Sequence, residues 1–140
     1  MTDILLSIKK PFSDLILSEE KKWELRKTEP RAMKDGPITL WLYESGKDGA
    51  HAIIGKCQTK YALPMLQQLD NWQRLWMMRE ACITEEYLSS YIPCRAWNLT
   101  SPVRLPYAVP LSAIGLTRPP QSWQYLTPDQ AAILERRGSE

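Results

Sequence analysis

The sequence is poor in the side chains that hold metals or drive histidine-based chemistry. Its 140 residues include one histidine, His51, and three widely spaced cysteines with no CxxC pair. A structural zinc site needs about four nitrogen or sulfur ligands, and no cluster of carboxylates suggests another metal. We therefore expect no metal and no cofactor. His51 lies among alanines and isoleucines, so we expect a partly buried strand residue, which argues against a Ser-His-Asp or Cys-His mechanism. A role for His51 as a base is the alternative.

Long apolar runs are also missing. No stretch approaches the roughly 18 apolar residues that cross a bilayer. The N-terminal MTDILLSIKK lacks the pattern of a signal peptide. We therefore expect a cytoplasmic protein with no membrane contact. Apolar residues make up 44% and charged residues 24%, close to globular averages, so residues 1–140 are expected to fold as a single domain.

The net charge is small, but the charged residues are unevenly distributed along the chain. The net charge of +2 is too small to indicate a nucleic-acid binder by itself. All nine lysines lie in the first sixty residues, and residues 87–128 contain arginines but no acidic residue. If folding brings these segments together, they form a positive groove for phosphates. An ordinary mixed surface is the alternative that composition leaves open.

Hydrophobic periodicity predicts strands toward both ends of the chain and helices in the middle. Apolar or alternating runs predict a short helix at 12–18 and strands at 4–8, 22–27, 38–43 and 51–61. Leu66, Leu69, Trp72 and Trp76 follow helical spacing, so we expect a helix opening near Pro64 with both tryptophans in the core.

The second half of the chain carries clear helix caps. Thr84 can cap a helix that runs to Tyr91 and stops before Pro93. The segment 95–114 is strand-like but interrupted by prolines. A capping box with proline at its first position opens the last helix at Thr127. This arrangement favours an α+β fold, a small β-barrel with helices packed around it.

A charged pattern stands out in the strand at 22–27. Alternation places Glu24 and Arg26 on one face, opposite Trp23 and Leu25, and Lys21 precedes them at a turn that should expose it. A lysine acts as a nucleophile or base only when burial or a nearby cation lowers its pKa. Arg26 can supply that cation or clamp a phosphate, and Glu24 can transfer a proton. The alternative is a solvent-facing ion pair contributing about 0–1 kcal/mol.

Five further residues are candidates for ligand contact. Tyr43, at a strand end, can stack on a base or donate its phenolic proton, and Ser122 can donate from a proline-flanked loop. Lys9 and Lys47 can contact phosphates, and Trp123 can stack on a base. Core packing for the aromatic residues and solvation for Lys47 are the simpler alternatives.

The segment Ser7–Pro11, followed by residues 17–26, resembles the opening of ASCH domains. That family has a G-x-K-x-x-E-x-R signature, which Lys21, Glu24 and Arg26 match, while Glu19 occupies the glycine position. A non-glycine residue resists a positive φ there. Residues 42–45, 51–57 and 119–123 resemble later family segments in the expected order.

This resemblance implies a PUA-like barrel of about five to six mostly antiparallel strands, with a cleft near the signature. It also implies RNA or a modified nucleoside as the ligand, because relatives include ribonucleases and N4-acetylcytidine amidohydrolases. Fold alone does not fix which activity applies. The oligomeric state stays open.

Two functions follow from the candidates. The first is a hydrolase of RNA or an acylated nucleoside with Lys21, Glu24, Tyr43, Lys47 and Ser122 at its site. The second is a non-catalytic, regulatory RNA-binding module that uses Lys9, Lys21, Arg26 and Lys47 on phosphates. A partner-binding domain without a nucleic-acid role is a third option.

Overall fold

The computed structural model describes residues 2–139 as an α+β fold with two sheets. The large sheet has the order β7-β4-β3-β1-β8 and the small sheet the order β2-β6-β5. The strands of the large sheet are β1 (Thr2–Lys9), β3 (Ile38–Ser45), β4 (Ile53–Thr59), β7 (Thr100–Val109) and β8 (Trp123–Tyr125). Those of the small sheet are β2 (Trp23–Arg26), β5 (Ala62–Met65) and β6 (Cys94–Asn98).

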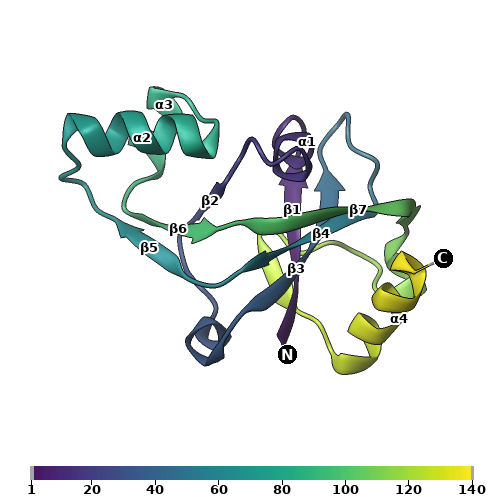
Figure 1. Ribbon diagram of the computed structural model, residues 1–140. Helices are drawn as coiled ribbons and strands as arrows, with labels where there is room; N and C mark the ends of the chain where they lie inside the picture. Colours follow the sequence, from purple (N-terminus) through teal and green to yellow (C-terminus); the bar gives the residue numbers. More distant parts are fainter. Residues whose placement is uncertain (1, 140) are drawn as a thin grey trace.

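Strand pairing is mostly antiparallel, as expected. The exception is the parallel pair β1 and β3, in which Leu5 lies beside Trp41. β6 leads through Leu99 directly into β7, so one nearly continuous stretch of chain passes from the small sheet into the large one (Figure 1). The α+β class is confirmed. The expected small barrel of about five to six strands is not confirmed as a closed barrel, because the eight strands of residues 2–139 form two separate sheets.

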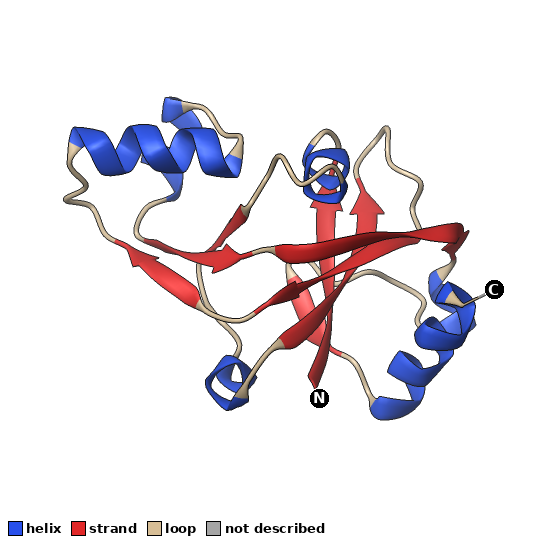
Figure 2. Cartoon of the chain, in the orientation of Figure 1, coloured by secondary structure: helices blue, strands red, loops and turns tan. Residues whose placement is uncertain are grey.

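The helices lie at the ends and edges of the sheets. They are α1 (Phe12–Leu17), α2 (Asn71–Ala81), α3 (Glu85–Tyr91) and α4 (Pro128–Gly138), with 3₁₀ turns η1 (Arg31–Asp35) and η2 (Leu111–Ile114). Figures 1 and 2 show α2 and α3 together beside the small sheet, α4 at the opposite end and α1 beyond the end of β1. Of the helices described, none is long and apolar enough to span a membrane.

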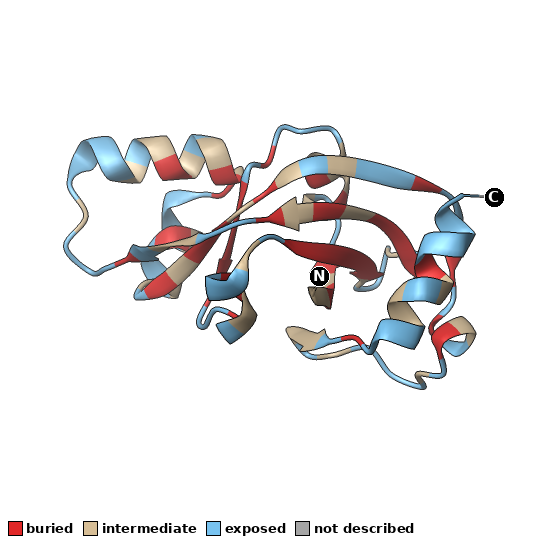
Figure 3. Cartoon of the chain, turned by 60° about the horizontal axis from the view of Figure 1, so that its bottom comes forward, coloured by how far each residue is buried: buried red, intermediate tan, exposed pale blue. Residues whose placement is uncertain are grey.

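The two faces of the large sheet bury separate cores. Alternation places Leu40 and Leu42 of β3 in one core and Trp41 and Tyr43 in the other, where Leu134 of α4 packs. A third core lies between the small sheet and the helices α2 and α3. Burial is accordingly concentrated in the strands, while the outer sides of the helices are exposed (Figure 3).

The predicted helix opening at Pro64 is wrong. Residues 62–65 form β5, and α2 begins only at Asn71, where the Asp70 side chain accepts a hydrogen bond of 2.8 Å from the backbone N–H of Gln73. Trp72 is 67% exposed and so is not a core residue. The buried residues of α2, Met77 and Ala81, lie in its second half.

The two predicted caps of the later helices are confirmed. Thr84 accepts a hydrogen bond of 3.1 Å from the N–H of Tyr87, and Thr127 opens a complete capping box. The strand position predicted for His51 is wrong. His51 is exposed at φ 55° in the loop before β4, because its N–H is held by the Glu44 carbonyl at 2.9 Å as the chain turns.

Candidate functional site

Lys21, Glu24 and Arg26 form a buried ion cluster. The two oxygens of the Glu24 carboxylate separate its partners: Oε1 lies 3.4 Å from Lys21 Nζ, and Oε2 lies 2.5 Å from Arg26 Nη2. The three residues are only 3%, 5% and 9% exposed, respectively. The expected exposure of Lys21 is therefore wrong. Its turn is covered by α2, whose Ala81 carbonyl accepts a hydrogen bond of 2.6 Å from Lys21 Nζ.

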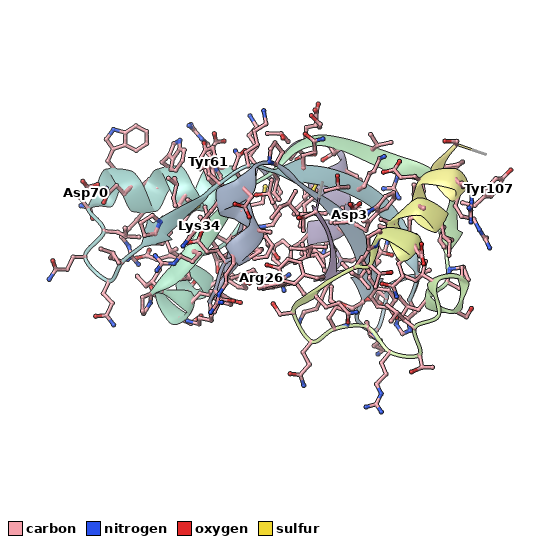
Figure 4. All side chains as sticks on the ribbon, turned by 90° about the horizontal axis from the view of Figure 1, so that it is seen from below. Asp3, Arg26, Lys34, Tyr61, Asp70 and Tyr107 are labelled. Carbon is pink, nitrogen blue, oxygen red and sulfur yellow. The ribbon has the colours of Figure 1, made fainter. Side chains whose placement is uncertain are left out.

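The alternation of β2 produces this cluster. Trp23 and Leu25 pack into the third core, so Glu24 and Arg26 project from the other face of the strand. Arg26 then crosses to the large sheet, where its Nη2 donates to the Ser7 carbonyl at 2.8 Å and its Nη1 to Ser122 Oγ at 2.9 Å. Arg26 thus joins the two sheets, and Figure 4 shows it in the middle of the molecule.

The guanidinium of Arg26 is fully engaged by the protein. Nε and Nη2 donate to Glu24 Oε2, Nη2 also donates to the Ser7 carbonyl, and Nη1 donates to both the hydroxyl and the carbonyl of Ser122. These bonds use all five N–H groups. Arg26 therefore positions Glu24 and Ser122 and contributes positive charge to the site, but it does not offer the vacant fork that clamps a phosphate.

The pKa of Lys21 is lowered below its ordinary value. Burial is the main cause, and the attraction of the Glu24 carboxylate offsets part of it. The ammonium also lies 4.9 Å from the centre of the Phe12 ring. Lys21 therefore meets the burial condition for a reactive lysine.

A cleft of about 380 Å³ opens beside this cluster, within the range of roughly 300–1,000 Å³ of small-molecule sites. Its lining comes from β1, α1, β2, the end of β3, α3 and the segment before β8, and it includes Lys9, Phe12, Glu24, Arg26, Tyr87, Tyr91 and Gln121. Lys21 lines a different cavity, of about 360 Å³, together with Glu19 and Ser101. Glu24 is therefore the member of the cluster that joins Lys21 to the cleft.

The other predicted site residues lie in different surroundings. Ser122 joins the site through Arg26, and because its Oγ accepts that bond, its O–H can still donate to a ligand. Trp123 is half-buried in β8 and contacts Trp97 edge-on at 5.7 Å. Tyr43 is 6% exposed and packs in the core cluster on the other face of the large sheet. Lys47 is exposed in the loop after β3.

That loop is anchored by a second buried carboxylate, which the sequence analysis did not single out. Glu44 is 3% exposed; it accepts a hydrogen bond of 2.6 Å from Ser13 Oγ and another of 2.9 Å from the N–H of Ala50. These bonds fix the two ends of the loop that carries Lys47.

Sequence reasoning also missed the tyrosines of the cleft. Tyr87 and Tyr91 lie four residues apart in a helix that the caps predicted, so their common face was visible in the sequence. Their position beside Glu24 was not, because it depends on how α3 packs against the rest of the fold.

Two of the three arginines in the acid-free segment are paired with carboxylates. Arg95 pairs with Glu29 at 3.5 Å, and Arg104 pairs with Asp14 at 3.2 Å. The cations that line the cleft are instead Lys9 and Arg26. Within residues 2–139, no group of three or more histidine, cysteine or acidic side chains is placed to hold a metal ion.

Comparison with solved structures shows an ASCH-type fold. The chain is similar to an ASCH protein from Zymomonas mobilis, with a TM-score of 0.76 and 19% identity over 96% of this chain and 94% of that one. The similarity to a tyrosine-to-phenylalanine variant of that protein has a TM-score of 0.78 and 18% identity. It covers 97% of this chain and 98% of that one.

A more distant similarity is to the N-terminal domain of Staphylothermus marinus McrB, with a TM-score of 0.59 and 11% identity over 96% of this chain and 93% of that one. Neither the scan of family models nor the search of curated proteins found a match. Similarity at this level of identity establishes the fold.

The sequence departs from the ASCH signature at Glu19, but the backbone there has the left-handed conformation that glycine favours. Glu19, at the position of the signature glycine, has φ 71°. The chain therefore keeps a left-handed residue there without glycine, at some cost in strain.

Proposed function

We propose that this cleft binds RNA or a modified nucleoside. The supporting observation is that a buried carboxylate, held between two cations, lines a cleft of nucleoside size whose rim carries an exposed lysine, Lys9. The carboxylate of Glu24 can accept hydrogen bonds from a base edge, while Lys9 attracts a phosphate. Lys47 can reach the same phosphate chain from its exposed loop.

We further propose that the ligand is hydrolysed there, as a ribonuclease or an N4-acetylcytidine amidohydrolase would do. Hydrolysis requires a proton from the attacking group to reach the leaving group. Glu24 lines the cleft, and Lys21, with its lowered pKa, lies 3.4 Å behind it, so the pair offers a route for that proton. Tyr43 and Ser122 are the proposed hydroxyl donors.

Two solved variants of the Zymomonas mobilis protein each lack a single hydroxyl group. One replaces a tyrosine with phenylalanine and another a serine with alanine, and each change removes only a hydroxyl group. In this chain Ser122 is already bonded to the ion cluster through Arg26. Tyr43 would have to reach the cleft from the far face of the sheet.

A non-catalytic RNA-binding module is the second candidate. It is favoured by one observation: the Lys21 ammonium already has the Ala81 carbonyl, Glu24 and the Phe12 ring as partners, and Lys21 does not line the cleft. Lys21 would then serve only to hold Glu24 in place.

The deciding experiment compares wild type with Lys21→Met, which keeps the apolar stem and removes the charge. Lys22→Met, at the exposed neighbouring position, is the matched control. A short single-stranded RNA and N4-acetylcytidine are incubated with each protein and followed by chromatography, and thermal unfolding verifies that each variant is folded.

Turnover of either substrate that Lys21→Met abolishes and Lys22→Met retains is the result expected of a hydrolase. Intact substrates, together with RNA binding that weakens when Lys9 is changed to serine, would show the binding module instead. If wild type neither binds nor converts either compound, the proposal is wrong and a partner-binding role takes its place.

A further inference from the structure

One wall of the cleft is a row of aromatic rings that the proposed function does not yet use. We call Phe12, Tyr87 and Tyr91 the aromatic wall. The rings of Tyr87 and Tyr91 are stacked, with centroids 5.4 Å apart and planes 6° from parallel, and Phe12 lies tilted against Tyr87 at 6.1 Å. All three side chains line the cleft.

Both ends of the aromatic wall are capped by cations. The Lys27 ammonium lies over the Tyr91 ring, 4.7 Å from its centre, and the Lys21 ammonium lies over Phe12 at 4.9 Å. The ring faces are thus occupied by one another and by ammonium groups. What the two tyrosines offer to a ligand is their ring edges.

Ring edges have a defined preference. The edge of an aromatic ring is electropositive and its face electronegative, so an edge contacts the face of another π system in a T-shaped arrangement. Each of the four nucleobases presents such a face. The pKa of Tyr87 is raised to about 12, mainly by burial, so its phenol stays protonated in neutral solution. The wall therefore adds no negative charge that would repel a phosphate.

We propose that the aromatic wall is the subsite for a single unpaired nucleobase, whose plane lies against the edges of Tyr87 and Tyr91. The edge of that base then points toward Glu24, and its phosphate lies on the side of Lys9. The inference rests on the proposed binding of RNA or a nucleoside in this cleft and assigns the base to the side of the cleft formed by α3. A cleft of about 380 Å³ accepts one base with its ribose.

The experiment measures binding of two labelled strands of equal length and charge: a five-nucleotide RNA, and the same strand with its bases removed. Wild type is compared with Tyr91→Leu, Tyr87→Leu and the control Tyr107→Leu. Tyr107 is 73% exposed on β7, at the end of the molecule far from α3 (Figures 1 and 4). Thermal unfolding verifies that each variant is folded.

We expect Tyr91→Leu to weaken binding of the intact RNA by about fivefold or more, as loss of one aromatic contact to a base does, and to leave binding of the abasic strand unchanged. Tyr91→Phe, which keeps the ring, should bind RNA like wild type. Tyr107→Leu should have no effect. If Tyr87→Leu fails to fold, Tyr91→Leu alone decides.

The two proposals fail in different ways. If Lys9→Ser weakens RNA binding but Tyr91→Leu binds both strands as wild type does, the RNA site stands and the aromatic wall is not the base subsite. An equal loss of affinity for the intact and the abasic strand in Tyr91→Leu also overturns the inference. If wild type binds neither strand, both the inference and the proposed function are wrong.

Discussion

At the scale of single residues, burial changes the titration of Cys57 in a way that unfolding can reveal. Cys57 is 1% exposed, and burial, with a smaller contribution from Glu24, raises its pKa from 9.0 to about 12. The unfolded chain loses this proton near pH 9, while the folded protein keeps it to about pH 12. The folded state therefore binds more protons in that window, and stability falls as the pH rises through it.

We predict that changing Cys57 to valine flattens this alkaline loss of stability. One proton of difference corresponds to a slope of about 1.4 kcal/mol per pH unit, which the variant should lose in part. Urea unfolding between pH 8 and pH 11 measures it. Cys82→Asn is the control, because Cys82 is only half-buried and its φ of 57° is a left-handed conformation that asparagine tolerates. Parallel curves for wild type and Cys57→Val would contradict the prediction.

The ion cluster makes a second prediction at this scale. Changing Arg26 to methionine removes five hydrogen bonds and leaves Glu24 buried with only Lys21 as a charged partner. Removing one partner of a buried pair costs about 3 kcal/mol or more. We expect that loss in denaturant unfolding, against less than about 0.5 kcal/mol for Arg118→Met at an exposed position. An equal effect of the two changes would contradict the account.

At the scale of elements, β4 depends on a close approach that only glycine allows. A Cβ at Gly55 would lie 2.7 Å from Leu17 Cδ2 of α1 and 2.8 Å from the Val103 carbonyl of β7. The carbonyl belongs to a paired strand and cannot simply turn away. We predict that Gly55→Ala destabilises the protein by about 1–3 kcal/mol through this clash, measured by thermal unfolding. An unfolding temperature equal to that of wild type would contradict the prediction.

Local signals predicted the elements that carry their own caps and periodicity. The alternation of β2, the short α1 and the caps of α3 and α4 were all visible in the sequence. The helix predicted from Pro64 to Trp76 was wrong at its start, because its helical spacing competes with a pairing of β5 and β6 across some thirty residues. Such pairing is fixed by the tertiary structure, and propensity does not report it.

The residues of the candidate site fall into two groups: those that local sequence patterns predicted, and those that only the tertiary fold brings together. Lys21, Glu24 and Arg26 are neighbours in sequence, so strand alternation predicted their common face, although not the burial of Lys21 under α2. Ser122 is 96 positions from Arg26, and the sequence offered a hydroxyl there without indicating its partner. Tyr87 and Tyr91 reach the cleft only because α3 folds back toward the cluster.

At the scale of the whole molecule, the cleft exists because two sheets meet at one point. β2 belongs to the small sheet, β1 and β8 belong to the large one, and Arg26 connects them. Helix α3 adds a third side to the cleft through Tyr87 and Tyr91. A ligand in the cleft would therefore contact each of these parts, and we expect its binding to stabilise the protein as a unit.

The most direct test of the central claim is the salt dependence of RNA affinity in wild type, Lys9→Ser and Lys34→Ser. Lys34 is an exposed lysine in η1, the 3₁₀ turn that precedes β3, and it does not line the cleft. We predict that affinity for a short single-stranded RNA falls with rising salt, and that Lys9→Ser weakens it and lowers the slope of log affinity against log salt by about 0.7. Lys34→Ser should match wild type. Equal effects of the two changes, or no RNA binding by wild type, would contradict the account.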